Sequence, residues 1–327
     1  RVYDESIEDY EESILRSPDF PTVHRNLALA YYNVKKLPQR AYEEMEKAFA
    51  LDETDARVYL ELDQLKKRLN VAVKERWSDM EKHFDLVESR DDLYLEYVTL
   101  LNTLGEPEKA LGLIKARKFH QWEGGEGKVA AQYLTALYQL AKAAVEKEDY
   151  AEAKELLLRA VREYPHNLGE GKLESGQENN LYYLLGLVQE KLGEAKDAFE
   201  SLTRACCGES EPVGMMYYND QPPEMIYYQG LAYRMLGEEE QAVRRFQKLV
   251  DYGREHIRDD VKIDYFAVSL PDLLIFEENL NERNRKHCLF MMSLGLKGLG
   301  RIDEAEKCAE ELLAMDNAHQ EIRVHDL

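Results

Sequence analysis

The feature that most constrains the fold is a pattern of about 34 residues that returns along the 327-residue chain. Each copy has a Leu-Gly pair, an acidic turn and an alanine five residues after the glycine. The clearest copies are 97–116, 186–205, 230–249 and 293–312. Sustained strand-like alternation is absent, and apolar residues recur with helical spacing. The pattern therefore predicts an all-α chain of repeated helix pairs.

This spacing resembles the tetratricopeptide repeat, in which two antiparallel helices occupy each unit. Small residues at the eighth and twentieth positions let the two helices approach closely, as Gly186 with Ala198 and Gly230 with Ala242 would. A large residue at the twenty-fourth position, such as Phe246, then fills the next gap. The glycine of each Leu-Gly pair is expected to end the first helix in a left-handed cap. We expect a right-handed α-solenoid.

The whole chain, 1–327, is predicted to be one superhelical domain. The expected parts are the second helix of a truncated first repeat (1–20), repeats two to four (21–118), repeats with long inserted loops (119–318) and a frayed tail (319–327). Repeat three departs most from the consensus, with the charged residues Lys66 and Glu75 where tyrosine and alanine are usual.

Four long connections separate the late repeats, at 119–128, 164–177, 208–223 and 251–282. In a stacked array such connections share one edge, and insertions on one face are often the binding face. Their aromatic and apolar residues need something to pack against, which is the array itself, a ligand or another domain. The ligand or partner-binding candidates on this edge are Trp122, Glu123, Asn167, Glu170, Asp264 and Tyr265.

The stretch WEGGEGK (122–128) and the GEGK at 169–172 raise the question of a phosphate-binding loop. That motif needs G-x-x-x-x-G-K-[ST] after a strand. Trp122 replaces its first glycine, and Val129 and Leu173 replace its Ser/Thr. We expect loops that lead into a helix, with glycine at positive φ and glutamates near the helix start. Paired ligand-contact loops are the alternative.

A second candidate surface is the inner groove. Tyr138, Tyr183 and Tyr227 occupy the fifth position of successive first helices, which points into the groove. Such a ladder could stack on a peptide or sugar and hydrogen-bond to it. The alternative is ordinary surface tyrosine, since the chain has 21 of them.

Composition excludes several classes of protein. A net charge of −21 repels nucleic acid and anionic membranes, and no apolar run reaches the roughly 18–20 residues of a membrane span. The four cysteines lack CxxC spacing, so we expect reduced helix-core thiols and a cytoplasmic location. His120, His166 and His287 follow no metal-ligand spacing, and we expect neither a metal nor a cofactor.

Catalytic machinery is not evident either. Asp264, Asp272, Glu277 and Glu278 lie in the last insertion, but an acid/base pair would need two carboxylates at a set separation. Neither GxSxG nor a cysteine–histidine constellation is present. The sequence therefore predicts a non-catalytic chain.

Three loop phrases, at 122–128, 164–173 and 262–288, resemble the C-terminal part of a family of uncharacterised bacterial proteins. In that family a mutarotase-like β-sandwich precedes a tetratricopeptide array, and the resemblance covers nearly the whole chain. It implies an upstream domain and a setting in carbohydrate metabolism, without catalytic residues to transfer. Two hypotheses follow: a scaffold for a protein partner or its own upstream domain, or an accessory part of a carbohydrate-active enzyme.

Overall fold

The protein is helical throughout the part that the computed structural model describes, namely residues 2–122, 124–171, 177–214, 220–262 and 275–325. Secondary structure in these ranges consists of helices and turns, so the all-α prediction is confirmed. Consecutive helices pack in pairs, which is the predicted arrangement; the pairs are α2 with α3, α9 with α10, α11 with α12, α13 with α14 and α15 with α16. The handedness of the array stays a prediction.

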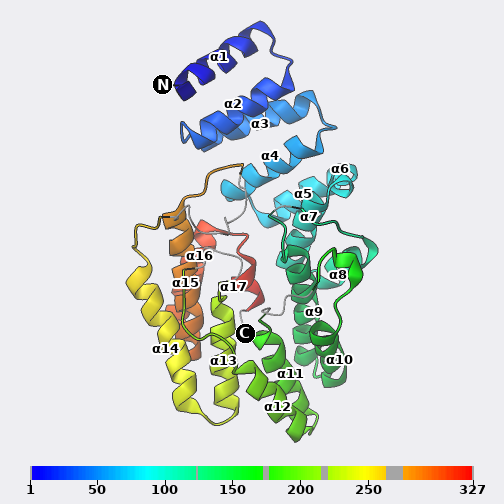
Figure 1. Ribbon diagram of the computed structural model, residues 1–327, viewed down its shortest axis with the longest axis vertical. Helices are drawn as coiled ribbons and strands as arrows, with labels where there is room; N and C mark the ends of the chain where they lie inside the picture. The colour runs from blue at the N-terminus through cyan, green and yellow to red at the C-terminus, as the bar shows by residue number, and fades with distance from the viewer. Residues whose placement is uncertain (1, 123, 172–176, 215–219, 263–274, 326–327) are drawn as a thin grey trace. The chain divides into compact units, whose positions relative to one another are not determined.

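The chain divides into two compact units, which we describe separately. Unit 1 comprises residues 1–100 and 273–278, and unit 2 comprises 101–272 and 279–327. Unit 1 contains α1 (Val2–Arg16), α2 (Pro21–Asn33), α3 (Pro38–Leu51), α4 (Ala56–Arg68), α5 (Val73–Lys82), α6 (Phe84–Ser89) and most of α7 (Asp91–Thr103) (Figure 1). That one domain spans 1–327 stays a prediction.

Unit 2 contains the long-loop repeats. Its helices are α8 (Pro107–Ala116), α9 (Lys128–Glu146), α10 (Tyr150–Arg162), the short η1 (His166–Leu168), α11 (Asn179–Lys191), α12 (Ala195–Ala205), α13 (Pro223–Met235), α14 (Glu239–His256), α15 (Leu280–Gly298), α16 (Ile302–Met315) and α17 (Gln320–Val324). Each first helix packs on its own second helix and also on the next first helix, as α11 does on α12 and α13. First helices α9, α11, α13 and α15 therefore form one continuous layer.

The predicted close approach of paired helices is confirmed. A Cβ atom added to Gly186 would lie 2.6 Å from the Leu202 side chain, and one added to Gly230 would lie 2.5 Å from Phe246. Ala242 on the partner helix is fully buried. A side chain larger than hydrogen at these glycines would push the paired helices apart.

The predicted left-handed caps are also present. Gly193 follows α11 with φ of +77°, and Gly237 follows α13 with φ of +81°. Both residues donate their backbone N–H to the last turn of the helix that they end, at 3.0 Å. Glycine has no Cβ to oppose this conformation, which explains why a Leu-Gly pair marks each turn.

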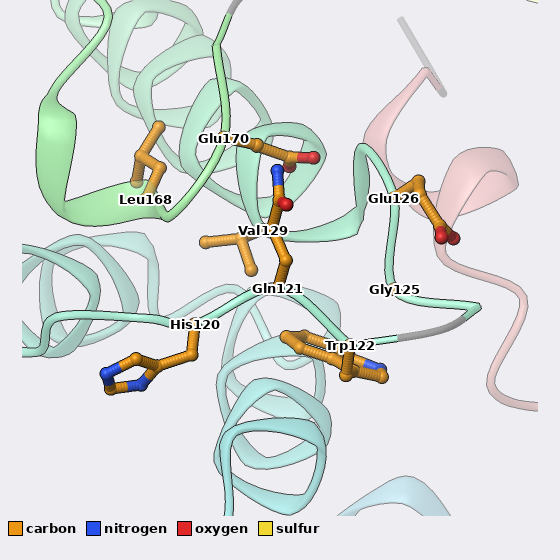
Figure 2. Close-up of a pocket in the computed structure, with 8 residues that line it drawn as sticks. All are labelled: His120, Gln121, Trp122, Gly125, Glu126, Val129, Leu168 and Glu170. Carbon is orange, nitrogen blue, oxygen red and sulfur yellow. The ribbon is translucent and has the colours of Figure 1, made fainter.

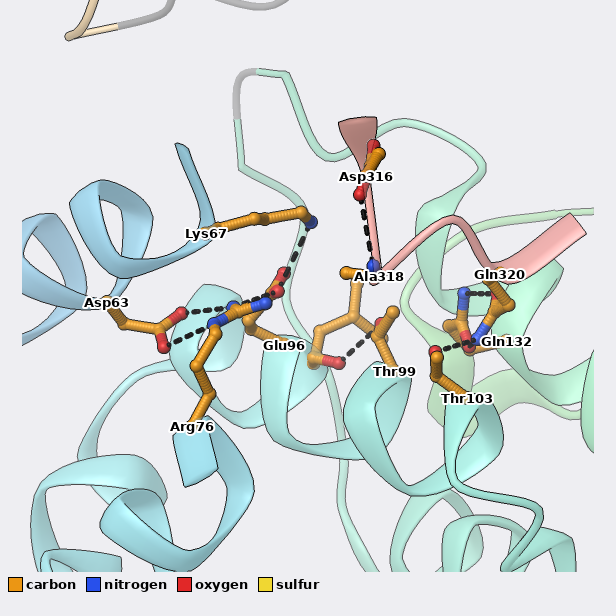
Figure 3. Close-up of polar contacts among 11 residues, drawn as sticks. Asp63, Lys67, Arg76, Glu96, Thr99, Thr103, Gln132, Asp316, Ala318 and Gln320 are labelled. Atoms are coloured by element: carbon orange, nitrogen blue, oxygen red, sulfur yellow. Dashed lines mark hydrogen bonds and ion pairs between the residues drawn. The ribbon is translucent and has the colours of Figure 1, made fainter. Parts of the chain in front are cut away.

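The degenerate third repeat contains buried and partly buried ion pairs. Arg76 on α5 is almost fully buried and donates to Asp63 at 3.0 and 2.6 Å and to Glu96 at 2.7 Å (Figure 3). Lys66, the first of the unusual residues, pairs with Asp79 at 2.6 Å. Ion pairs therefore join α4, α5 and α7 in unit 1.

Two sequence predictions are wrong. Residues 319–327 were expected to be a frayed tail, but Gln320–Val324 form helix α17, with Ile322 and Val324 buried. Four helix-core cysteines were expected; all are free thiols, yet Cys207 is exposed because it lies just beyond the end of α12.

Candidate functional site

The two GEGK loops lie side by side on one edge of unit 2, as predicted. The Gly127 N–H, at the start of α9, donates to the Glu170 carboxylate at 2.7 Å. Phe119 N–H donates to the Asn167 carbonyl at 2.8 Å. Between the loops is a pocket of about 310 Å³ (Figure 2). Its lining residues are His120, Gln121, Trp122, Gly125, Glu126, Val129, Leu168 and Glu170.

The helix start that resembled a phosphate site does bind an anion, but that anion belongs to the protein. Gly127 precedes α9 with φ of +74°, and its N–H points to Glu170 from the second loop. A carboxylate at a helix N-terminus stabilises the helix through the unpaired backbone donors and the helix dipole. The glutamate predicted to support a helix start is therefore supplied by the neighbouring loop.

Trp122 packs within this edge. A Cβ atom added to Gly125 would lie 2.3 Å from the indole ring, so the ring covers the Gly125 backbone. The Trp122 side chain is half-buried and lines the pocket. Only glycine at position 125 permits this contact, which accounts for the second glycine of the phrase.

The polar residues of the pair are largely used internally. The Asn167 amide donates to the Ile114 carbonyl at 2.7 Å and to the Arg117 carbonyl at 2.9 Å, which closes the end of α8. One Glu170 oxygen accepts from Gly127, while its second oxygen, Oε1, is buried and has no hydrogen-bond partner among the described residues. Asn167 therefore has a structural role, and Glu170 retains one acceptor.

The remaining edge candidates lie outside the described residues. These are Glu123, Asp264 and Tyr265, together with Asp272. The described end of the last insertion, Ile275–Glu277, contacts α2 and α4 of unit 1. That the whole 251–282 insertion lies beside the GEGK loops stays a prediction.

The three groove tyrosines form a buried cluster instead of an open ladder. Tyr138 is 1% exposed and Tyr227 is 3% exposed, and Tyr183 is partly buried. Their common neighbour is Tyr228, whose ring centroid lies 5.5 Å from Tyr183 and 5.4 Å from Tyr227. Two different neighbours cover the tyrosines that were expected to face solvent: the Tyr138 ring lies 5.6 Å from the His325 ring, and the Tyr227 ring lies 5.7 Å from the Phe246 ring of α14.

Helix α17 and His325 occupy the inner face of the first-helix layer. Tyr228 hydroxyl bonds to Tyr138 hydroxyl at 2.7 Å and to His325 Nδ1 at 3.0 Å. Lys142 on α9 donates to the Val324 carbonyl at 2.8 Å. Gln320 donates to Thr103 at 3.1 Å and exchanges hydrogen bonds with Gln132 (Figure 3).

Burial shifts the pKa of several groups at this interface. Burial, followed by the nearby Lys142 charge, lowers the pKa of His325 to about 3, so the imidazole is neutral. Burial, followed by the Glu321 charge, raises the pKa of Glu224 on α13 to about 8. Burial also raises the pKa of Tyr138 and Tyr228 above the ordinary range. Tyr138, Tyr228, His325 and Glu224 are therefore mainly uncharged at neutral pH.

Sequence reasoning missed Tyr228, His325 and Gln320, which carry these contacts. A weak signal was available: two adjacent aromatic residues, Tyr227 and Tyr228, need a large apolar packing surface. The tail offered a second signal, because Ile322 and Val324 are apolar and were not expected in a solvated end.

Metal and membrane features are not found in the described ranges. No group of three or more His, Cys, Asp or Glu side chains there could hold a metal ion. No helix there combines the length and apolar character of a membrane span.

Comparison with known proteins identifies the repeats. Residues 138–212 match one family model described as tetratricopeptide repeat, and residues 224–252 match a second. These two stretches are tetratricopeptide repeats (TPRs). The first match runs from within α9 to beyond α12, and the second covers nearly all of α13 and most of α14, so both include first and second helices of unit 2.

Several solved structures are similar to this chain. Yeast Tom70 is 11% identical over 98% of this chain and 57% of its own, with a TM-score of 0.41. PilW, a type IV pilus biogenesis factor, is 13% identical over 71% and 92%, with a TM-score of 0.37. YrrB, a TPR protein with an unusual peptide-binding site, is 17% identical over 77% and 95%, with a TM-score of 0.26. Similarities this low support no inference about the ligand of this chain.

Proposed function

We propose that this chain is a non-catalytic, cytoplasmic TPR interaction domain, and that the inner face of unit 2 binds a short segment of a partner protein. The observation that carries the proposal is α17. A five-residue helix is too short to be stable alone, so its structure depends on the surface that holds it. The inner face thus already holds a peptide, supplied by the same chain.

The contacts of α17 are of the kind that hold a peptide ligand. Apolar Ile322 and Val324 are buried, and Lys142 binds a main-chain carbonyl rather than a side chain. His319, just before α17, lies 5.1 Å from the ring of Phe290 on α15. Anchors and main-chain contacts of this kind let a helix-layer groove accept a segment from another protein.

The test is binding of a fluorescent peptide with the sequence of residues 319–327 to a chain shortened to end at Ala318. We expect the shortened chain to bind the peptide and the full chain to bind it at least about tenfold more weakly, because the attached segment competes at high effective concentration. A peptide carrying Ile322→Asp is the control and should not bind. A shortened chain that keeps its circular dichroism spectrum and melting temperature but ignores the peptide would contradict the proposal.

The partner of the proposal is either a separate protein or an upstream β-sandwich domain of the same bacterial protein. Pull-down with a purified upstream domain distinguishes the two. Binding that is lost when residues 319–327 are supplied in excess would assign the groove to that domain.

A second candidate function rests on the edge pocket. Trp122 supplies an aromatic surface there, and the unpaired Glu170 oxygen supplies a hydrogen-bond acceptor, a combination that suits sugar hydroxyls. As an accessory part of a carbohydrate-active enzyme, the chain would contribute this edge to a shared site. Retention on immobilised glycans that Trp122→Ala abolishes and Trp77→Phe preserves would support this function.

A further inference from the structure

The end of the 251–282 insertion docks on unit 1 in the way that a peptide docks on a receptor. Ile275–Glu277 belong to unit 1, although the helices on both sides of the insertion belong to unit 2. The receiving residues are Tyr32, Asn33, Lys36 and Arg68, which we call the clasp site. They lie at the ends of α2 and α4 and in the turn after α2, all within unit 1.

The Asn33 side chain forms hydrogen bonds with the main chain of the segment at two points. Its amide donates to the Ile275 carbonyl at 2.9 Å, and its carbonyl oxygen accepts from the Glu277 N–H at 2.9 Å. One side-chain amide thus pairs with residues two apart, as a neighbouring strand would. Arg68 donates to the Phe276 carbonyl between them at 3.0 Å.

Phe276 is the anchor. Its side chain is fully buried and meets the Tyr32 ring edge-on at a centroid distance of 5.0 Å. The Arg68 guanidinium lies 5.8 Å from the Phe276 ring centroid. Aromatic pairing and the cationic contact add to the burial of a large apolar side chain. A buried aromatic ring surrounded by main-chain hydrogen bonds is typical of a peptide-recognition site.

Glu277, the residue after Phe276, is recognised by an ion pair. Glu277 forms an ion pair with Lys36, and both side chains are well exposed. An exposed pair adds little affinity but favours one sign of charge at that position. Lys36 and Arg68 also place positive charge here in a chain whose net charge is −21.

We propose that the clasp site is a receptor for an extended segment of the form bulky apolar residue, Phe, Glu, and that a partner protein presenting such a segment can replace Ile275–Glu277. The attached segment competes with the partner, so partner binding and release of the insertion are linked. The clasp site and the inner face of unit 2 consist of different residues, and this proposal does not rest on the function proposed for that face.

The test uses the full chain with Phe276→Ala, which removes the anchor of the attached segment and leaves all four clasp residues in place. The probe is a fluorescent peptide with the sequence of residues 273–279. We expect this variant to bind the peptide at least about tenfold more tightly than the natural chain, because attached competitors act at millimolar effective concentration. A second host, Glu277→Pro, lacks the N–H that Asn33 accepts and should behave in the same way.

Matched variants assign the binding to the clasp site. Asn33→Ala in the Phe276→Ala chain should weaken peptide binding about tenfold, the effect of losing two hydrogen bonds. Gln39→Ala, an exposed amide elsewhere in unit 1, should leave it unchanged. A peptide with alanine in place of phenylalanine should not bind. If both hosts keep the natural melting temperature and bind no better than the natural chain, or if Asn33→Ala has no effect, the proposal is overturned.

Discussion

At the scale of single residues, Phe246 shows how glycine positions determine the array. Its ring lies where Cβ atoms of Gly230 and Gly298 would be, at 2.5 and 2.2 Å. Phe246 is fully buried on α14, between first helices α13 and α15. Three helices therefore meet at one ring, and two of them can do so only because they carry glycine there.

A substitution at Gly230 tests this packing. Gly230→Ala should lower the free energy of unfolding by about 1–3 kcal/mol, because the added methyl group overlaps the Phe246 ring. The control is Gly112→Ala on α8, where a Cβ meets nothing within 4 Å, and which should raise stability by about 0.5–1 kcal/mol. Urea unfolding of the two variants checks the opposite signs. Equal effects would show that the close contact has no energetic role.

Arg76 shows a residue-scale feature that depends on charge. Burial opposes ionisation of Glu96, but Lys67 and Arg76 outweigh it and lower the pKa of Glu96 to about 2. Removing one partner of a buried ion pair typically costs about 3–5 kcal/mol, because the other charge is left unpaired. Arg76→Met should therefore be strongly destabilising.

The double variant Arg76→Met with Asp63→Leu should recover most of the stability that the single variant loses, since it leaves no unpaired charge next to α4. Chemical unfolding of the natural chain, both single variants and the double variant gives the coupling directly. Additive losses would contradict a paired role for Arg76 and Asp63.

The glycine packing around Phe246 could be predicted from the sequence, whereas the ion pairs of Arg76 could not. Gly186, Gly230 and Phe246 could be predicted because packing of identical repeats imposes a fixed spacing. Arg76 could not, because its partners Asp63 and Glu96 lie 13 and 20 positions away on other helices. No helical periodicity selects such partners.

At the scale of elements, α17 shows why a terminal helix escapes sequence reasoning. Five residues provide no periodic pattern, and the helix forms because α9 and α13 hold it. The edge loops were more predictable: connectivity alone placed 119–128 beside 164–171. Which of their polar atoms remain free could not be predicted, since the Asn167 partners lie on α8, about 50 residues earlier.

The contact between α13 and α17 should make stability depend on pH. Burial, followed by the Glu321 charge, raises the pKa of Glu224 from its ordinary value of 4.5 to about 8. Between these pH values the unfolded chain releases a proton that the folded chain keeps, so the Glu224 contribution to stability falls as pH rises through this window.

Replacing Glu224 with glutamine removes this pH-dependent contribution to the free energy of unfolding. Relative to the natural chain, Glu224→Gln should gain stability steadily as pH rises from 5 to 8, measured by urea unfolding at several pH values. Glu255→Gln, at an exposed position on α14, serves as the control and should show a constant difference. A Glu224→Gln difference that is also constant with pH would contradict the assignment.

At the scale of the whole molecule, the excess of negative charge should oppose folding. The chain carries 64 acidic and 43 basic side chains, which gives a net charge of −21. Self-repulsion at this charge destabilises compact states, and salt screens it over a Debye length of about 10 Å at 0.1 M.

Raising sodium chloride from 0.05 to 0.5 M should therefore raise the melting temperature by several degrees, measured by differential scanning fluorimetry at pH 7.5. Sucrose at matched osmolarity controls for general solute effects. A melting temperature that falls with salt would mean that ion pairs such as Arg76 with Asp63 dominate over the net repulsion.

The clasp site also has a consequence for synthesis. The hydrogen bond between Asn33 and Ile275 joins residues 242 positions apart. A ribosome that adds roughly 5–20 residues per second needs roughly 12–48 s to cover that separation. Throughout this interval unit 1 emerges without the segment that later covers Tyr32 and Arg68. During synthesis the clasp site is therefore uncovered for this interval, and a ribosome-associated factor or a co-translated partner can bind there without competition from Ile275–Glu277.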